Sequence, residues 1–306
     1  MAFQAVSPTF VRPKQRMDRK LNFTPYLILL LTILCPLIAG AARPIRILAI
    51  GNSFSEDAIE QNFREICASE GESVIVGNLF QAACDIDTHL ENLENENKAY
   101  RYRKITADGR IIEIKKATML QALRDEKWDY ISFQQGSKNS GIYSSYAKLG
   151  RLLEMVREIV GKQPVFMWHM TWAYASNSKH EGFKAYNMSQ LSMFHSIELC
   201  ANKVMRDYPE LKILIPTGTA IQDARTVISK GDDLTRDGYH LELTVGRYVA
   251  ACTWCTAIFR RILPFDTWHP KSVSPDDARI AIEAAHIAVM HPWTIIPLEI
   301  FVKAKP

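Results

Sequence analysis

From residue 43 onward, short apolar segments alternate with longer segments whose apolar residues recur at helical spacing. The short segments predict five buried strands, namely Arg46–Ile50, Ser73–Leu79, Trp128–Gln134, Val165–Met170 and Leu211–Pro216. The longer segments predict helices, namely Asp57–Glu70, Tyr146–Val160, Phe183–Met205, Val245–Ile262 and Pro275–Met290. Strands that alternate with helices are typical of a mostly parallel sheet with helices on both faces, so we expect an α/β fold.

One segment interrupts this alternation. Tyr100–Lys104 and Arg110–Lys115 are strand-like and flank Ala107-Asp108-Gly109. Because Asp-Gly supplies the positive φ angles that a tight turn needs, the segment predicts a β-hairpin inserted into the α/β body. No linker rich in glycine, serine or proline divides residues 43–306, and they contain no internal repeat. The sequence therefore predicts one domain over residues 43–306.

The first 42 residues have the layout of a secretory signal. A basic stretch that ends at Lys20 is followed by an uncharged, mostly apolar run, Tyr26–Ala42, which only Pro36 interrupts. Small residues at the end of this run suit cleavage by a signal peptidase just before Arg43. We expect residues 1–42 to be a signal peptide with an N-terminal extension, and the protein to be secreted or periplasmic. An uncleaved membrane anchor is the alternative.

The charge distribution argues against nucleic acid as a partner. Hydrophobic residues make up 47% of the chain and charged residues 23%, which excludes a disordered or fibrous protein. Residues 1–42 hold five basic and one acidic side chain, whereas the remaining 264 residues hold 32 of each sign. A neutral body lacks the positive charge that binds phosphate backbones. We expect contact with a membrane only through the signal peptide.

The sequence predicts neither a metal nor a cofactor. Five cysteines follow the signal segment, without the spacing of a disulfide framework. Cys252 and Cys255 form a CxxC pair, but they lie in an apolar stretch and no second ligand pair has zinc spacing, so we expect structural thiols. There is also no GxGxxG, Walker or HExxH sequence and no cluster of carboxylates.

A candidate nucleophile follows the first strand. Ligands of parallel sheets bind at the carboxyl ends of the strands, and here the chain reads Gly51-Asn52-Ser53-Phe54-Ser55. The glycine permits a sharp turn, so Ser53 lies near backbone N–H groups that stabilise negative charge. In the plainer interpretation, Ser53 or Ser55 caps the following helix.

A candidate acid–base pair lies nearer the C-terminus. The segment Arg236-Asp237-Gly238-Tyr239-His240 places an aspartate and a histidine three residues apart in a turn. The carboxylate can orient the imidazole, which then faces a serine from elsewhere in the fold. Alone, the pair is also consistent with a surface turn, because DxxH often occurs by chance. Its combination with Ser53 favours a catalytic triad.

These two segments resemble blocks of the SGNH/GDSL hydrolases. Gly51–Ser55 is similar to the first block of that family, with Asn52 where Asp is common, and Asp237–His240 is similar to its last block, DxxH. The resemblance covers residues 43–306 and looks closest to a bacterial branch of exported SGNH-hydrolase-like proteins. It implies a three-layer α/β/α sandwich with a flavodoxin-like parallel five-stranded sheet. It also implies Ser53 as the nucleophile, His240 as the general base and Asp237 as its orienting acid.

The middle blocks of that family are altered in this sequence. The oxyanion hole implied by the resemblance uses the backbone N–H groups of Ser53 and of Ala83, where the family has glycine. In place of the family's GxND, the chain has Gln134-Gln135-Gly136-Ser137, and we expect the longer amide of Gln135 to donate to the oxyanion.

Aromatic side chains end the fourth strand. Trp168, His169 and Trp172 either line a cleft that stacks on sugar rings or pack in the core, and we take them as candidate substrate-binding residues. For His169, a structural hydrogen bond to a backbone carbonyl is the alternative.

We therefore expect an exported serine esterase that removes O-acetyl groups from carbohydrate through an acyl-enzyme on Ser53. Its partner is then a glycan ester or small-molecule ester. The carbohydrate part rests on export, on the aromatic strand end and on family analogy. The alternatives are a catalytically weak glycan-binding protein on the same scaffold and, more remotely, acyl transfer to sugars.

Overall fold

A seven-stranded sheet forms the centre of the structure, a computed structural model that describes residues 43–228 and 233–298. The strand order is β4-β3-β2-β1-β5-β6-β7. The five parallel strands are β1 (Ile45–Gly51), β2 (Val74–Phe80), β5 (Tyr130–Phe133), β6 (Val165–His169) and β7 (Leu211–Ile215). Their order confirms the flavodoxin-like parallel sheet. The signal peptide predicted for residues 1–42 lies outside the described residues.

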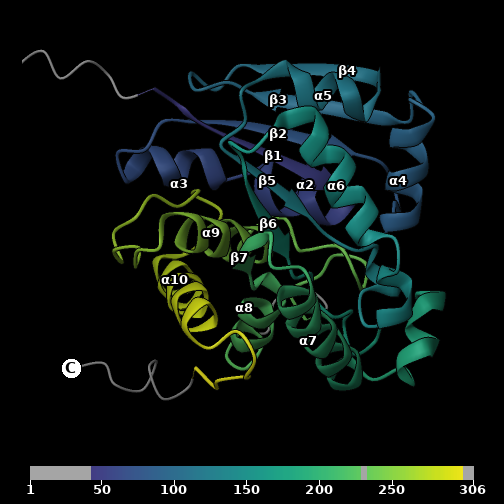
Figure 1. Cartoon of the computed structure of the whole chain (residues 1–306). Coiled ribbons are helices and arrows are strands. Elements are labelled where there is room, and N and C mark those ends of the chain that lie inside the picture. Colours follow the sequence, from purple (N-terminus) through teal and green to yellow (C-terminus); the bar gives the residue numbers. More distant parts are fainter. Residues whose placement is uncertain (1–42, 229–232, 299–306) are drawn as a thin grey trace, which may run out of the picture. The chain divides into compact units, whose positions relative to one another are not determined.

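The predicted hairpin is present, and it extends the same sheet. It consists of β3 (Tyr100–Ile105) and β4 (Ile111–Ala117), with β3 antiparallel to β2. At its turn Gly109 has φ 85°, and the N–H of Thr106 donates to the carbonyl of Arg110 over 2.9 Å. The hairpin therefore raises the strand count from five to seven. Figure 1 shows it at one end of the sheet.

Helices cover both faces of the sheet (Figure 1). The first face carries α2 (Ser53–Ile59), α3 (Phe63–Ser69) and α9 (Val245–Phe259), and α8 (Thr217–Ala224) and α10 (Pro275–Met290) pack against α9. The second face carries α4 (Ile86–Glu94), α5 (Met119–Asp125), α6 (Leu149–Val160) and α7 (Gln190–Asp207). Short 3₁₀ turns are η2 (Ser137–Asn139), η3 (Tyr143–Tyr146) and η4 (Glu181–Tyr186). This arrangement confirms the three-layer α/β/α sandwich.

Two predicted helices are divided by residues in left-handed conformations. The helix expected over Asp57–Glu70 separates into α2 and α3, because Asn62 has φ 63°. The helix expected from Phe183 separates into η4 and α7, because Asn187 and Met188 both have φ 55°. Helical periodicity continues across such breaks in the sequence, so it does not reveal them.

Strand burial follows from the layering. Ile47–Ile50 of β1 are at most 1% exposed, since helices cover both faces of this inner strand. The edge strand β4 is the opposite case, because Ile111, Ile112 and Ile114 are all exposed. Helix α10 begins as predicted, with Ser274 as the cap and Pro275 in its first turn.

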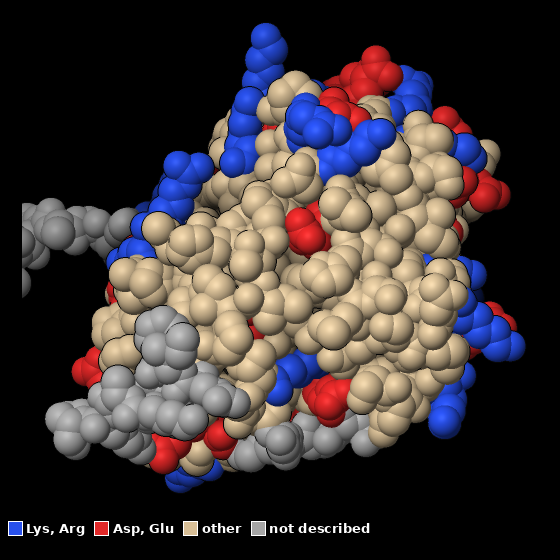
Figure 2. Space-filling view, turned by 90° about the horizontal axis from the view of Figure 1, so that it is seen from below, with Lys and Arg blue, Asp and Glu red and all other residues tan. Residues whose placement is uncertain are grey.

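Three further properties of the described residues bear on function. The five cysteines of the described chain are buried and form no disulfide, and Cys252 and Cys255, predicted as structural thiols, lie inside α9. None of the described helices combines the length and hydropathy needed to cross a bilayer. On the face seen from below in Figure 2, charged side chains of both signs lie mainly around the margin, and the middle is largely uncharged.

Asp223 of α8 is a buried carboxylate with an incomplete set of partners. Its Oδ1 accepts a hydrogen bond from the N–H of Ile296 over 2.7 Å, whereas its Oδ2 is buried without a hydrogen-bond partner among the described residues. Burial raises the pKa of this carboxyl to about 7. In the unfolded chain the pKa of this carboxyl is near 3.8. The contribution of Asp223 to the stability of the fold is therefore present below pH 3.8 and is lost as the pH rises through about 7.

We predict that Asp223→Asn stabilises the protein at about pH 8 and changes its stability little at about pH 4. The pKa of Asp223 is about three units higher in the folded than in the unfolded protein, so the gain in the free energy of unfolding at high pH is at most ~4 kcal/mol. Chemical denaturation of both proteins at the two pH values measures it. A variant with the same stability difference at both pH values would contradict the role of ionisation.

Candidate active site

The carboxyl ends of the parallel strands lie at one edge of the sheet, and the predicted site residues gather there. Ser53 follows β1, Ala83 follows β2 and Gln135 follows β5. Asp237 and His240 come from the segment between α8 and α9, far away in the sequence.

Ser53 is the first residue of α2 and is half-buried. The helix cap is Asn52, whose side chain accepts a hydrogen bond from the N–H of Phe54 over 2.9 Å. Ser55 is buried, and its hydroxyl donates to the Asn52 carbonyl over 2.8 Å. Neither serine therefore supplies the cap. Within the described residues the Ser53 hydroxyl takes part in no hydrogen bond, which leaves it available to a substrate.

Gly51 makes the turn between β1 and α2 possible because it has no side chain. A Cβ at this position would lie 2.6 Å from Oγ of Ser55 and 2.9 Å from the side chain of Gln134. Both neighbours are themselves buried, so a larger residue here would displace the start of α2.

Asp237 and His240 form the predicted hydrogen-bonded pair. Oδ2 of Asp237 lies 2.6 Å from Nδ1 of His240, and Oδ1 accepts from the backbone N–H of His240 over 2.8 Å. Burial alone would raise the pKa of Asp237, but these hydrogen bonds outweigh it and hold the pKa below its ordinary value. An ionised carboxylate only accepts hydrogen bonds, so Nδ1 of His240 donates and Nε2 is left to act as a base.

The His240 ring lies against the helix that carries Ser53. Its centroid is 6.2 Å from that of Phe54, with the rings edge to face, and Phe54 stacks on Trp172 at 4.1 Å. Because Phe54 directly follows Ser53, the structure brings the candidate base into the neighbourhood of the candidate nucleophile. No hydrogen bond between Ser53 and His240 is formed in the described structure.

Ala83 keeps the backbone donor that was expected of it. It has φ 54°, the left-handed conformation that favours glycine, and its side chain is exposed. Alanine adopts this conformation here at a cost of about 1–2 kcal/mol. The N–H groups of Ser53 and Ala83 donate to no other group of the described residues, so both are available to an oxyanion.

The role predicted for Gln135 does not fit its contacts. Its side chain is buried, and Nε2 donates to both the carbonyl and the hydroxyl of Ser145, over 2.9 and 3.0 Å. Its Oε1 accepts from the N–H groups of Ile86 and Gly136. With both amide hydrogens in use, Gln135 joins loops to each other and has no donor left for an oxyanion.

The predicted substrate-binding residues are also corrected by the structure. Trp168, His169 and Trp172 are at most 2% exposed, so they pack in the core and do not line a cleft. Trp172 donates from Nε1 to the carbonyl of Tyr239 over 2.8 Å. Trp172 therefore supports the turn that contains His240.

Asn52 connects three of the segments at this edge. Its Oδ1 accepts from Phe54 N–H, so its Nδ2 points the other way and donates to the Cys84 carbonyl over 3.0 Å. Nε2 of Gln134 donates to the same Oδ1 over 2.9 Å. One amide thus links the start of α2, the loop after β2 and the end of β5.

The chain of hydrogen bonds continues across the sheet. Oε1 of Gln134 faces Nδ1 of His169 at 3.0 Å, and Nε2 of His169 faces the Thr217 hydroxyl at 3.1 Å. Because Gln134 presents an acceptor, Nδ1 of His169 donates and Nε2 accepts. Burial lowers the pKa of His169 to about 3, so the ring stays neutral and structural, and its partners are side chains.

Residues at the rim of the site were not predicted as functional. Tyr239 and His180 are half-buried and lie beside each other, with ring centroids 4.9 Å apart, and Tyr239 also contacts His240 at 4.1 Å. Burial lowers the pKa of His180; the negative charge of Glu181 opposes this change, and the positive charge of Lys138 adds to it. The position of Tyr239 inside the DxxH segment was the available sequence signal. His180 had none.

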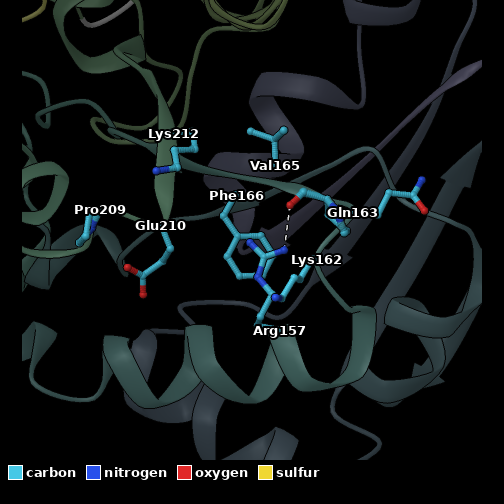
Figure 3. Close-up of a pocket in the computed structure, with 9 residues that line it drawn as sticks. Arg157, Lys162, Gln163, Val165, Phe166, Pro209, Glu210 and Lys212 are labelled. Carbon is cyan, nitrogen blue, oxygen red and sulfur yellow. Dashed lines mark hydrogen bonds between the residues drawn. The ribbon is translucent and has the colours of Figure 1, made fainter.

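A cavity of about 510 Å³ lies elsewhere, where β6 and β7 begin (Figure 3). Arg157 places its guanidinium 3.5 Å from the centroid of the Phe166 ring and donates to the carbonyl of Pro164. Val165 and Lys212 are near the amino ends of their strands, so this cavity is separate from the edge that holds Ser53. In the described chain no group of three His, Cys, Asp or Glu side chains is placed to hold a metal.

We predict that Asn52→Asp destabilises the fold, although Asp is common at this position in the family that the segment resembles. The new carboxylate has no donor for the Cys84 carbonyl and places a second oxygen against it. Loss of this buried hydrogen bond lowers the free energy of unfolding by about 1–3 kcal/mol. Denaturant titration measures the change.

Asn95→Asp is the matched control for this variant. Asn95 also donates from Nδ2 to a backbone carbonyl, that of Glu91 over 2.9 Å, but it is exposed at the end of α4. We expect it to change the free energy of unfolding by less than about 0.5 kcal/mol. Equal losses in the two variants would show that the buried link of Asn52 has no special weight.

Comparisons with solved structures show one high likeness and several distant ones. The crystal structure of a DUF4886 family protein from Bacteroides uniformis ATCC 8492 is 46% identical, with a TM-score of 0.80, over 84% of this chain and 98% of that chain. A lipolytic protein of the G-D-S-L family from Veillonella parvula DSM 2008 is 14% identical, with a TM-score of 0.42, over 71% and 100%. The catalytic domain of peptidoglycan O-acetyltransferase A from Streptococcus pneumoniae is 9% identical, with a TM-score of 0.38, over 81% and 94%. Likenesses as distant as the last two carry no inference about activity.

The search of curated proteins found no match. A family model, described as Domain of unknown function (DUF4886), matches residues 46–288. This match covers most of the chain and agrees with the solved Bacteroides uniformis structure. The chain therefore belongs to the DUF4886 family.

Proposed function

We propose that this protein is a serine esterase of the SGNH type. The observation that supports this most is the pair formed by Asp237 and His240, whose side chains lie 2.6 Å apart, with the His240 ring against Phe54. An orienting carboxylate, an imidazole with a free Nε2 and an adjacent serine are the parts that nucleophilic acyl transfer requires.

In the proposed first step, Nε2 of His240 accepts the proton of the Ser53 hydroxyl as Oγ attacks the ester carbonyl. The N–H groups of Ser53 and Ala83 donate to the oxyanion of the tetrahedral intermediate. The imidazolium, held by Asp237, then gives its proton to the departing alcohol, and the acyl group stays on Ser53.

In the second step, His240 accepts a proton from water, and the resulting nucleophile attacks the acyl-enzyme. The intermediate collapses, the proton returns to Oγ of Ser53 and the acid leaves. The net reaction consumes one ester and one water and yields one acid and one alcohol. Small chain movements must bring Ser53 and His240 into hydrogen-bond contact, as is common when substrate binds.

As the substrate we propose O-acetylated carbohydrate, met outside the cytoplasm after export through residues 1–42. Since Trp168 and Trp172 are buried, the aromatic ring that supports this choice is the half-buried Tyr239, next to His240. A tyrosine ring packs on the apolar face of a sugar while its hydroxyl stays hydrated.

A second candidate function is glycan binding with little or no catalysis. One observation favours it, namely the commitment of both amide hydrogens of Gln135 to Ser145. An oxyanion hole that lacks a side-chain donor is expected to be slower by about 10² to 10³. The intact Asp237–His240 pair favours catalysis, because binding alone does not need it.

We predict that Ser53→Ala lowers kcat for acetate release by about 10⁴ to 10⁶, and that Asp237→Asn lowers it by about 10⁴. The substrates are p-nitrophenyl acetate and a panel of acetylated sugars. The Ser53 variant loses the nucleophile, whereas the Asp237 variant loses the acid that orients His240.

Ser192→Ala is the control, because this serine is exposed near the start of α7 and its hydroxyl takes part in no hydrogen bond among the described residues. It is expected to keep the wild-type rate. If the wild type and Ser53→Ala release acetate equally slowly while both retain affinity for a glycan, the binding function is the correct one. N-terminal sequencing of the protein recovered outside the cytoplasm tests cleavage before Arg43.

A further inference from the structure

Asp57 is a fully buried carboxylate with an unusually complete set of partners. Its side chain is 0% exposed, and it accepts hydrogen bonds from Arg236, Arg247 and the backbone N–H of Leu241. Nη1 of Arg236 lies 2.9 Å from Oδ2, and Nη2 of Arg247 lies 2.7 Å from Oδ1. A buried charge is stable only when it is paired in this way.

These partners lie on both sides of His240 in the sequence. Arg236 and Leu241 bracket the turn that holds the acid–base pair, and the N–H of Arg236 donates to the carbonyl of His240 over 2.9 Å. The guanidinium of Arg236 also donates to the Leu241 carbonyl. Asp57 thus accepts hydrogen bonds from residues at both ends of the turn that contains His240.

Asp57 is also fixed relative to Ser53. The two residues are four positions apart on α2, which is close to one helical turn, so they lie on the same face of the helix. Nε of Arg247 on α9 donates to Oδ1 of Asp57 over 2.9 Å and ties the helix to the layer that covers the sheet. The side chain of Asp57 is therefore a direct hydrogen-bonded link between the helix of Ser53 and the turn of His240.

We propose that Asp57 is a positioning residue for catalysis, which sets the placement of His240 relative to Ser53 through its bonds to Arg236 and Leu241. This inference rests on the proposed esterase function. Asp57 does not touch the reacting atoms. Its charge holds two donor-only guanidinium groups, so a neutral side chain of the same shape loses the attraction that keeps the turn against α2.

Glu60 provides a matched control at the end of the same helix. Its carboxylate is 1% exposed and is also held by two arginines, Arg101 at 3.2 Å and Arg103 at 2.8 Å. Those arginines belong to β3, in the hairpin, and not to the turn of His240. Glu60→Gln therefore removes an equivalent buried charge without touching the link between Ser53 and His240.

The experiment compares Asp57→Asn, Glu60→Gln and Ser53→Ala in the full chain, with rates expressed per folded protein. For Asp57→Asn we expect kcat on p-nitrophenyl acetate to fall by about 10²-fold, the loss typical of a misplacement of about 1 Å. KM is expected to change by less than about threefold, because ground-state contacts remain. The rate at which a fluorophosphonate labels Ser53 is expected to fall with kcat, whereas Glu60→Gln keeps both rates.

The proposal is overturned if Asp57→Asn and Glu60→Gln have the same kcat per folded protein while Ser53→Ala is inactive. If Ser53→Ala keeps the wild-type rate, the proposed function fails and the positioning role fails with it. Should Asp57→Asn not fold, Arg236→Gln decides by the same criteria, since this arginine is 32% exposed and its loss leaves the pair of Asp57 and Arg247 intact.

Discussion

The architecture of the candidate site depends on the side-chain amide of Asn52. This one group accepts from Phe54 N–H and from Gln134, and it donates to the Cys84 carbonyl. A side-chain amide carries a strong acceptor and a donor with two hydrogens on the same carbon, so it can join segments that present both kinds of partner. The placement of Ser53 beside the loop of Ala83 follows from these bonds.

Helix α2 is too short to be stable by itself, because an isolated helix of seven residues does not repay the cost of its nucleation. Tertiary contacts hold it instead. Phe54 stacks on Trp172, while the carboxylates of Asp57 and Glu60 are each paired with two arginines. Asp223 on α8 differs, because no cation pairs with it among the described residues, and burial accordingly raises its pKa.

Much of the fold was predictable because its signals are local. The five parallel strands are short apolar runs, and the hairpin turn is marked by Asp108-Gly109. The candidate acid–base pair was also accessible, since Asp237 and His240 are three residues apart and hydrogen-bond within one turn. Breaks at Asn62 and Asn187 were not accessible, because helical periodicity persists across a left-handed residue.

The incorrect site assignments have a common physical cause, namely that a linear pattern does not say which groups cover a side chain. Trp168 and His169 belong to the inner strand β6 and are buried, because Trp168 packs against Tyr146 of η3 and His169 packs against Trp254 of α9. Gln135 finds its acceptors on Ser145, in the 3₁₀ turn η3 that follows η2.

The sequence by itself determined the alternation of strands and helices, the hairpin and the internal geometry of the Asp237–His240 pair, since each depends on residues close along the chain. Only the tertiary structure decided that Asp57 joins the helix of Ser53 to the turn of His240, across 184 positions of chain between Asp57 and Leu241. Such a contact forms because a buried carboxylate must find cations and N–H donors wherever the folded chain supplies them, and no local pattern encodes where that is.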